Sequence, residues 1–75
     1  MLVKETAHPL QLAPMDRLLR NAGAYRVSEE AKKALRDAIE KFANDIAQKA
    51  VNFAKHANRT TIKDKDIVLA AKELR

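Results

Sequence analysis

The chain has 75 residues and no cysteine, which excludes a disulfide framework and thiolate metal sites. Hydrophobic residues make up 47% of it, too many for a disordered chain, while one glycine, two prolines and few aromatic residues favour helices over strands. Fifteen Lys and Arg against ten Asp and Glu leave a formal charge of +5, which favours a polyanionic partner. A lone core is marginal at this length unless oligomerisation adds to it.

No segment has the length or composition of a membrane anchor. The longest uninterrupted apolar stretch, residues 67–71, is too short to span a bilayer. The N-terminal residues lack the apolar block of a signal peptide. We therefore expect an intracellular protein.

A first short helix is predicted over residues 14–22. Pro14 suits a first helical turn, where its missing N–H costs nothing. Gly23, the only glycine, stands where a left-handed cap is expected after a helix. Apolar residues recur at helical spacing on one side of this segment: Met15, Leu18, Leu19 and Ala22.

A long helix is predicted over residues 28–57. Ser28 is a good N-cap residue, no Gly or Pro follows it before Asn58, and Asn58 is a suitable left-handed stop. The apolar stripe of this helix consists of Leu35, Ile39, Phe42, Ile46, Ala50, Phe53 and Ala57. Three exposed acid–base pairs four residues apart are predicted on its outer side: Glu29–Lys33, Asp37–Lys41 and Asp45–Lys49.

A second short helix follows the connection 59–63. Asp64 and Asp66 are placed in its first turn, where negative charge is favourable. Apolar residues then repeat at helical spacing: Ile67, Ala70, Ala71 and Leu74. The pattern is all-α, with a short, a long and a short helix.

This pattern predicts a dimer. A helix of thirty residues is roughly 45 Å long, whereas each flanking helix reaches only about 15 Å. The flanking helices are therefore too short to cover the apolar stripe, and each uncovered Ile or Phe forgoes about 1.5–3 kcal/mol. A second copy that crosses the long helix near its middle would cover the rest.

The excess positive charge lies toward the ends of the chain. Residues 1–27 and 58–75 each carry a net charge of +2, and the long helix carries +1. In a dimer the connections 23–27 and 58–63 can meet and form one basic ledge, made of Arg26, Arg59, Thr60, Thr61 and Lys63. Such a ledge offers donors to phosphates but little that reads bases. The alternative is a solvated basic surface without a partner.

Three blocks in this order carry a family resemblance: LAPMDR at 12–17, AGAYRVS at 22–28 and AKHANRTTIK at 54–63, followed by Asp66 and Ile67. With them, the chain resembles an archaeal histone from about residue 12 to residue 74. The resemblance implies an all-α histone fold over residues 11–75 that forms a handshake dimer, in which two chains cross at their long helices. Residues 1–10 are then an N-terminal extension, which we expect to pack on a neighbour or to be flexible.

The resemblance implies that the dimer wraps duplex DNA. The residues implied in DNA binding are Arg17, Arg20, Arg26, Arg59, Thr60, Thr61 and Lys63. Arg17 and Arg20 would meet phosphates from the paired first helices. Arg26 would enter the minor groove, supported by Thr61 from the facing connection. The alternative for Arg26 is a surface arginine whose stem packs beside Tyr25.

Two further roles follow from the resemblance. Arg59 and Asp66 would form an intrachain salt bridge that fixes the second connection against the third helix. Dimers would join through a four-helix bundle formed with Phe53, His56, Asp66 and Leu69. There His56 would meet Asp66 of the other dimer, so its protonation would favour assembly. Without the resemblance, His56 is an ordinary surface or packing histidine.

The chain departs from the family pattern at three positions. Asn58 replaces a usual glycine, and asparagine tolerates a left-handed cap. Thr60 replaces a usual lysine and so removes one phosphate-binding charge from each copy of the chain. Lys65 stands at a commonly acidic position and restores charge nearby.

Nothing in the sequence points to an enzyme, a cofactor or a small-molecule substrate. Ser28 is explained as a cap, and His8 and His56 without cysteine make no recognised metal set. The leading prediction is an architectural chromatin protein on duplex DNA in the cytoplasm, associated with the chromosome (nucleoid). It would act as a homodimer or a heterodimer with a histone paralogue, with higher oligomers on DNA. The alternative is a histone-fold subunit of a heterodimeric transcription-associated complex; a membrane-binding helical protein is disfavoured by its few aromatic anchors.

Overall fold

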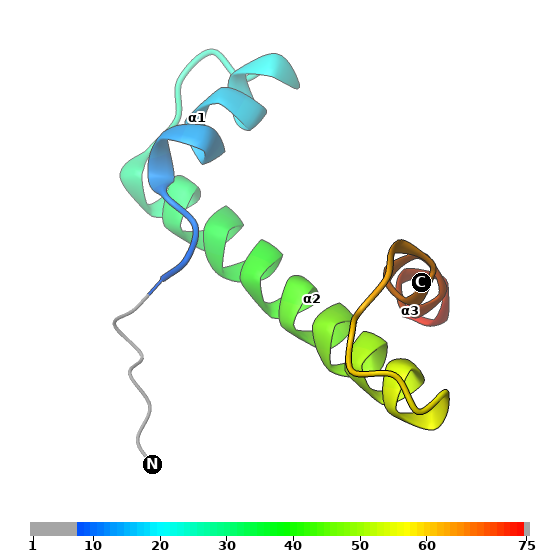
Figure 1. Cartoon of the computed structure of the whole chain (residues 1–75). Coiled ribbons are helices and arrows are strands. Elements are labelled where there is room, and N and C mark those ends of the chain that lie inside the picture. Colours follow the sequence, from blue (N-terminus) through cyan, green and yellow to red (C-terminus); the bar gives the residue numbers. More distant parts are fainter. Residues whose placement is uncertain (1–7, 75) are drawn as a thin grey trace. The chain divides into compact units, whose positions relative to one another are not determined.

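The computed structural model describes residues 8–74 and contains three helices in this range (Figure 1). They are α1 (Leu12–Asn21), α2 (Glu29–His56) and α3 (Asp64–Glu73), and no strand occurs among the described residues. The short–long–short order predicted from the sequence is confirmed. Helix α1 begins two residues earlier than predicted, so that Pro14 is its third residue, where the backbone N–H of a helix still has no intrahelical acceptor.

Local chemistry explains where the helices begin and end. The Oγ of Ser28 accepts a hydrogen bond of 3.0 Å from the backbone N–H of Ala31 and caps α2. Gly23 after α1 has a φ of 116°, and Asn58 after α2 has a φ of 57°. Both lie in the left-handed region that glycine adopts freely and asparagine tolerates. The predicted cap and both predicted helix stops are therefore confirmed.

The pairing of charged side chains on α2 differs from the prediction. None of the three predicted pairs, Glu29–Lys33, Asp37–Lys41 and Asp45–Lys49, is among the ion pairs of residues 8–74. Instead Glu29 lies 3.1 Å from Lys32, and Asp45 lies 3.5 Å from Lys41 on the preceding turn. Lys49 reaches Glu73 of α3 at 3.3 Å. An exposed pair is worth only about 0.2–0.5 kcal/mol, so small differences in surroundings decide which neighbour is chosen.

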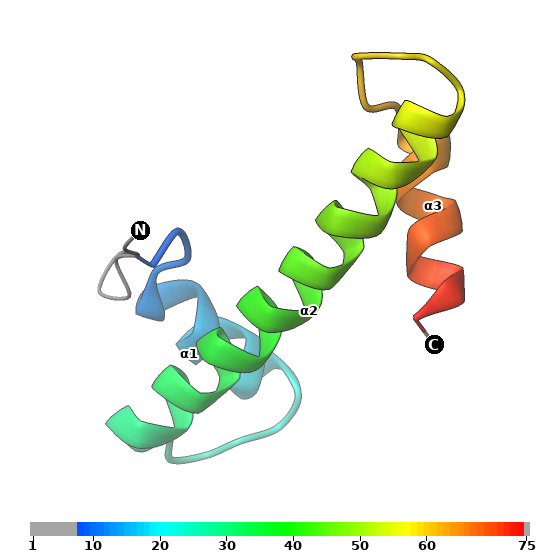
Figure 2. The ribbon, with the colours of Figure 1, turned by 90° about the horizontal axis from the view of Figure 1, so that it is seen from below.

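The chain divides into two compact units between Glu40 and Lys41, within α2. In the first unit α1 packs on the beginning of α2 and buries Met15. In the second unit α3 lies beside the last turns of α2 (Figure 2), and the contact buries Ala50, Ala54 and Ala70. Alanines at this contact allow the two helix backbones to approach closely.

The two units bury very few apolar side chains. Met15 and the three alanines are the only hydrophobic residues that are fully buried within 8–74. Large hydrophobic side chains remain exposed by 40–89%: Leu18, Tyr25, Phe42, Ile62, Ile67, Val68 and Leu69. So much apolar surface in water is what the length of α2 predicts for a single copy. The handshake dimer itself, and the division into an extension and a fold at residue 11, stay predictions; residues 1–7 of the extension lie outside the described range.

Candidate nucleic-acid interface

The first basic segment is the end of α1 with the loop that follows it. Arg20 lies in two hydrogen bonds: its Nε donates to Asp16 Oδ2 at 2.9 Å, and its Nη1 donates to the carbonyl of Tyr25 at 3.1 Å. The bond from Arg20 also holds the pKa of the Asp16 carboxyl below its usual value. Arg20 therefore ties the loop to α1, a positioning role that the sequence did not reveal.

Arg17 and Arg26 carry exposed side chains in the same unit. Arg26 lines an open hollow of about 490 Å³, together with Leu19, Ala24, Val27, Ser28 and Ala31. Its neighbour Tyr25 is 89% exposed, so it has little surface in contact with any other side chain. This exposure gives no support to the alternative in which the stem of Arg26 packs beside Tyr25.

The second basic segment is the loop between α2 and α3. The guanidinium of Arg59 binds the carboxylate of Asp66 through two bonds, Nη1 to Oδ2 at 2.8 Å and Nη2 to Oδ1 at 2.9 Å. Its Nη1 also donates to the carbonyl of Thr61 at 3.2 Å. The backbone N–H of Lys63 donates to Asp66 Oδ2 at 2.9 Å, a capping contact at the N-terminus of α3.

These bonds hold the charge of Asp66 in place. The side chain of Asp66 is only 4% exposed, and the hydrogen bonds from Arg59 hold the pKa of its carboxyl well below the usual range. The same contact raises the pKa of Arg59. The intrachain salt bridge implied by the resemblance is thus present in the structure, and it uses donors of Arg59 that the sequence also assigns to DNA. Thr60, Thr61 and Lys63 keep exposed side chains.

The residues predicted to join dimers lie in the second unit. His56 is exposed on the last turn of α2, with its Nδ1 2.9 Å from the carbonyl of Asn52, which leaves Nε2 for an outside partner. Phe53 is half-buried and Leu69 is about half exposed. Asp66 offers only a small exposed part of its carboxylate, because Arg59 and Lys63 already bind both oxygens.

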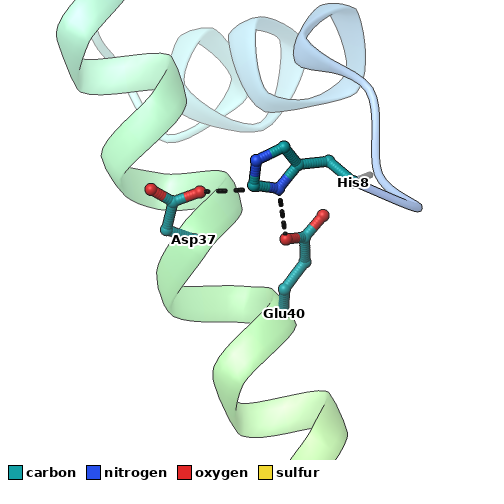
Figure 3. A group of neighbouring side chains, drawn as sticks. All are labelled: His8, Asp37 and Glu40. Atoms are coloured by element: carbon teal, nitrogen blue, oxygen red, sulfur yellow. Dashed lines mark hydrogen bonds and ion pairs between the residues drawn. The ribbon is translucent and has the colours of Figure 1, made fainter. Parts of the chain in front are cut away.

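A cluster of one histidine and two carboxylates was not predicted from the sequence. His8, before α1, lies against Asp37 and Glu40 of α2 (Figure 3). His8 and Glu40 are 32 positions apart, and no motif spacing connects them. Only packing of the segment before α1 on α2 brings them together.

The Asp66 contact predicts how stability depends on pH. Because its pKa is lowered in the folded state, the stabilisation is complete above the ordinary value of 3.8 and is lost as the pH falls below it. Asp66→Asn should therefore lower the melting temperature at neutral pH. In acid, the melting temperature of this variant should fall less steeply than that of the unchanged protein. Unfolding by circular dichroism between about pH 2 and pH 7 measures both effects.

Asp64→Asn is the matched control. Asp64 is exposed, and its carboxylate contacts the adjacent backbone N–H of Lys65. This variant should follow the acid decline of the unchanged protein. Parallel profiles for the unchanged protein and Asp66→Asn would contradict the assignment.

Two short helices flanking a long one, with a basic loop at each junction, define the class of histone-fold proteins. The family model described as histone-like transcription factor (CBF/NF-Y) and archaeal histone matches residues 8–71. One of the subunits of the archaeal histone HAN1 from Thermococcus zilligii is 52% identical over 63 residues, covering 84% of this chain and 94% of that protein. "Probable archaeal histone 3" of Methanocaldococcus jannaschii is 49% identical over 61 residues, covering 81% and 91%.

The chain belongs to the archaeal histone family, as its three sequence blocks predicted. It is accordingly a DNA-binding chromatin protein of the histone fold, associated with the chromosome, and not an enzyme. Among the described residues, no helix combines the length and the apolar character needed to cross a membrane.

Proposed function

We propose that this histone is an architectural protein that forms a dimer and wraps or compacts duplex DNA with little sequence specificity. The observation that carries the proposal is the pair of loops that flank α2. Each loop presents exposed basic or hydroxyl side chains, Arg26 in one and Thr60, Thr61 and Lys63 in the other. Arginine, lysine and threonine side chains with nearby backbone N–H groups suit phosphates and the minor groove, and they carry no base code.

The exposed apolar side chains support the dimer. Phe42 on α2 and the two consecutive residues Ile67 and Val68 on α3 are 41–56% exposed in the single chain. A second copy that crosses α2 would cover such residues and bring the first loop of one copy to the second loop of the other. The partner can be an identical chain or a histone paralogue.

Within this proposal the cationic residues fall into two groups. Arg17, Arg26 and Lys63 are exposed and contact DNA directly. Arg20 and Arg59 use part of their guanidinium groups to hold the loops and offer the remaining donors to phosphates. Thr60 and Thr61 add hydroxyl donors, and Thr61 supports Arg26 of the other copy.

Further assembly on DNA is part of the proposal. Phe53, His56 and Leu69 would form the contact between dimers, with His56 reaching the exposed edge of Asp66 in the next dimer. A protonated imidazole would strengthen this contact because Asp66 stays ionised. The site of action would be the nucleoid in the cytoplasm.

A second candidate function has support from the family description, which includes CBF/NF-Y transcription factors. In this alternative the chain pairs with a different histone-fold protein in a transcription-associated complex. Basic residues in both loops of one chain favour the symmetric dimer, since a specialised member of such a complex can lose one of the two. A purified chain that dimerises alone supports the first function, and one that requires a different partner supports the second.

Nuclease digestion of duplex DNA saturated with the purified protein tests the function. Wrapping should yield protected fragments of regular size, and stacking of dimers should yield a ladder with regular spacing. His56→Ala should shorten the protected fragments, because it weakens the contact between dimers but leaves the dimer folded. His8→Ala, which changes the other histidine, should leave the fragments unchanged. DNA without protected fragments at saturation would overturn the proposed function.

A further inference from the structure

We propose that His8, Asp37 and Glu40 form a binding site for a divalent transition-metal ion of the Zn²⁺ type, which fastens the segment before α1 to the middle of α2. His8 Nδ1 lies 2.8 Å from Glu40 Oε1 and 3.9 Å from Asp37 Oδ1. All three possible ligand atoms lie within 4.8 Å of one another. Figure 3 shows the imidazole pointing between the two carboxylates.

The spacing of these atoms suits tetrahedral coordination. Zinc binds imidazole nitrogen and carboxylate oxygen at about 2.0–2.1 Å, which places two ligands of a tetrahedron roughly 3.3 Å apart. The distances from His8 Nδ1 to Glu40 Oε1 (2.8 Å) and to Asp37 Oδ1 (3.9 Å) lie on either side of this value. Asp37 has an exposed side chain that can rotate toward the ion. Three protein ligands would leave the fourth position to water.

The types of ligand select the class of ion. An imidazole nitrogen with two carboxylates suits Zn²⁺, Co²⁺ or Ni²⁺, whereas Mg²⁺ and Ca²⁺ prefer oxygen ligands alone. The two carboxylates and the adjacent Arg36 leave a local charge of about −1, which a divalent cation offsets. The ion would have to compete with Arg36, whose Nε lies 3.1 Å from Asp37 Oδ1.

Glu40 is already oriented for such a role. Its Oε2 accepts a hydrogen bond of 3.1 Å from the backbone N–H of Leu10, so Oε1 is the oxygen turned to His8. An outer bond of this kind fixes the direction of a ligating carboxylate. The Glu40 side chain is only 13% exposed, and its bond with His8 holds the pKa of the carboxyl below the usual value.

Titration of the untagged full chain with Co²⁺ tests the site, because four-coordinate Co²⁺ absorbs visible light strongly. We expect a saturable absorption with one ion per chain, removed by added Zn²⁺. His8→Ala and Glu40→Gln should each weaken Co²⁺ binding at least tenfold. His56→Ala is the matched control, since it removes the only other histidine and should keep the absorption.

A second measurement does not depend on any variant. In the unchanged protein, added Zn²⁺ should shift the imidazole NMR signals of His8 and leave those of His56 in place. Added Zn²⁺ should also raise the melting temperature, because an ion that binds only the folded state stabilises that state. Absence of saturable Co²⁺ absorption, equal binding by His8→Ala, or a shift confined to His56 would each overturn the proposal. DNA wrapping measured by nuclease protection does not depend on this outcome.

Discussion

A rise in salt from about 50 to about 200 mM is expected to weaken the binding of duplex DNA by about 10³ to 10⁵-fold. The proposed interface has five cationic side chains per chain and hence ten per dimer: Arg17, Arg20, Arg26, Arg59 and Lys63. Six to ten phosphate contacts release enough counterions to cause a loss of this size. Fluorescence anisotropy of a labelled duplex, titrated at several salt concentrations, measures the slope of log K against log salt.

Single substitutions measure how much each residue contributes to the slope of log K against log salt. Lys63→Gln removes two contacts per dimer and should make the slope shallower by about 1.8, which is twice 0.9 per phosphate. Lys33→Gln removes the same charge from an exposed position on α2 and should leave the slope unchanged.

Arg26→Ala should weaken binding about equally on duplexes of different sequence, because minor-groove contacts carry little base information. A flat salt response would rule out the proposed contacts.

Phe42→Glu is expected to abolish the dimer at micromolar concentration. Phe42 is 48% exposed in the single chain and lies in the apolar stripe of α2. Burying a phenylalanine side chain is worth about 1.5–3 kcal/mol. Because about half of the Phe42 surface is already covered in the single chain, its two copies in a dimer contribute about 1.5–3 kcal/mol, which corresponds to a factor of roughly 10 to 10² in the dissociation constant. A buried glutamate without a partner adds to this loss.

Sedimentation and circular dichroism together measure the effect of Phe42→Glu. The variant should sediment as a monomer and lose much of its helical signal, because the described chain buries only four apolar residues on its own. Asn44→Glu introduces the same charge at an exposed polar residue of α2 that is not part of the apolar stripe, and it should remain a folded dimer. A folded monomer of the unchanged protein, or a dimer of Phe42→Glu, would contradict the handshake arrangement.

Local signals in the sequence were sufficient for the helices and their ends. Ser28, Gly23 and Asn58 act on the backbone within a few residues of their own positions, so their effects could be predicted without the fold. The helical spacing of apolar residues similarly predicted α2. The family resemblance added the Arg59–Asp66 pair, which joins residues only seven positions apart across one loop.

The sequence by itself thus determined the three helices, their caps and the family, because caps and periodicity act over one or two turns of chain. Only the tertiary structure decided which charged groups meet. Arg20 bonds to the Tyr25 carbonyl because the loop folds back over the end of α1, and His8 meets Glu40 because the segment before α1 packs on α2. The sequence spacing also did not predict that Glu29 pairs with Lys32 or that Lys49 pairs with Glu73. Exposed polar contacts differ by fractions of a kcal/mol, so the packed backbone selects among partners that sequence spacing leaves nearly equal.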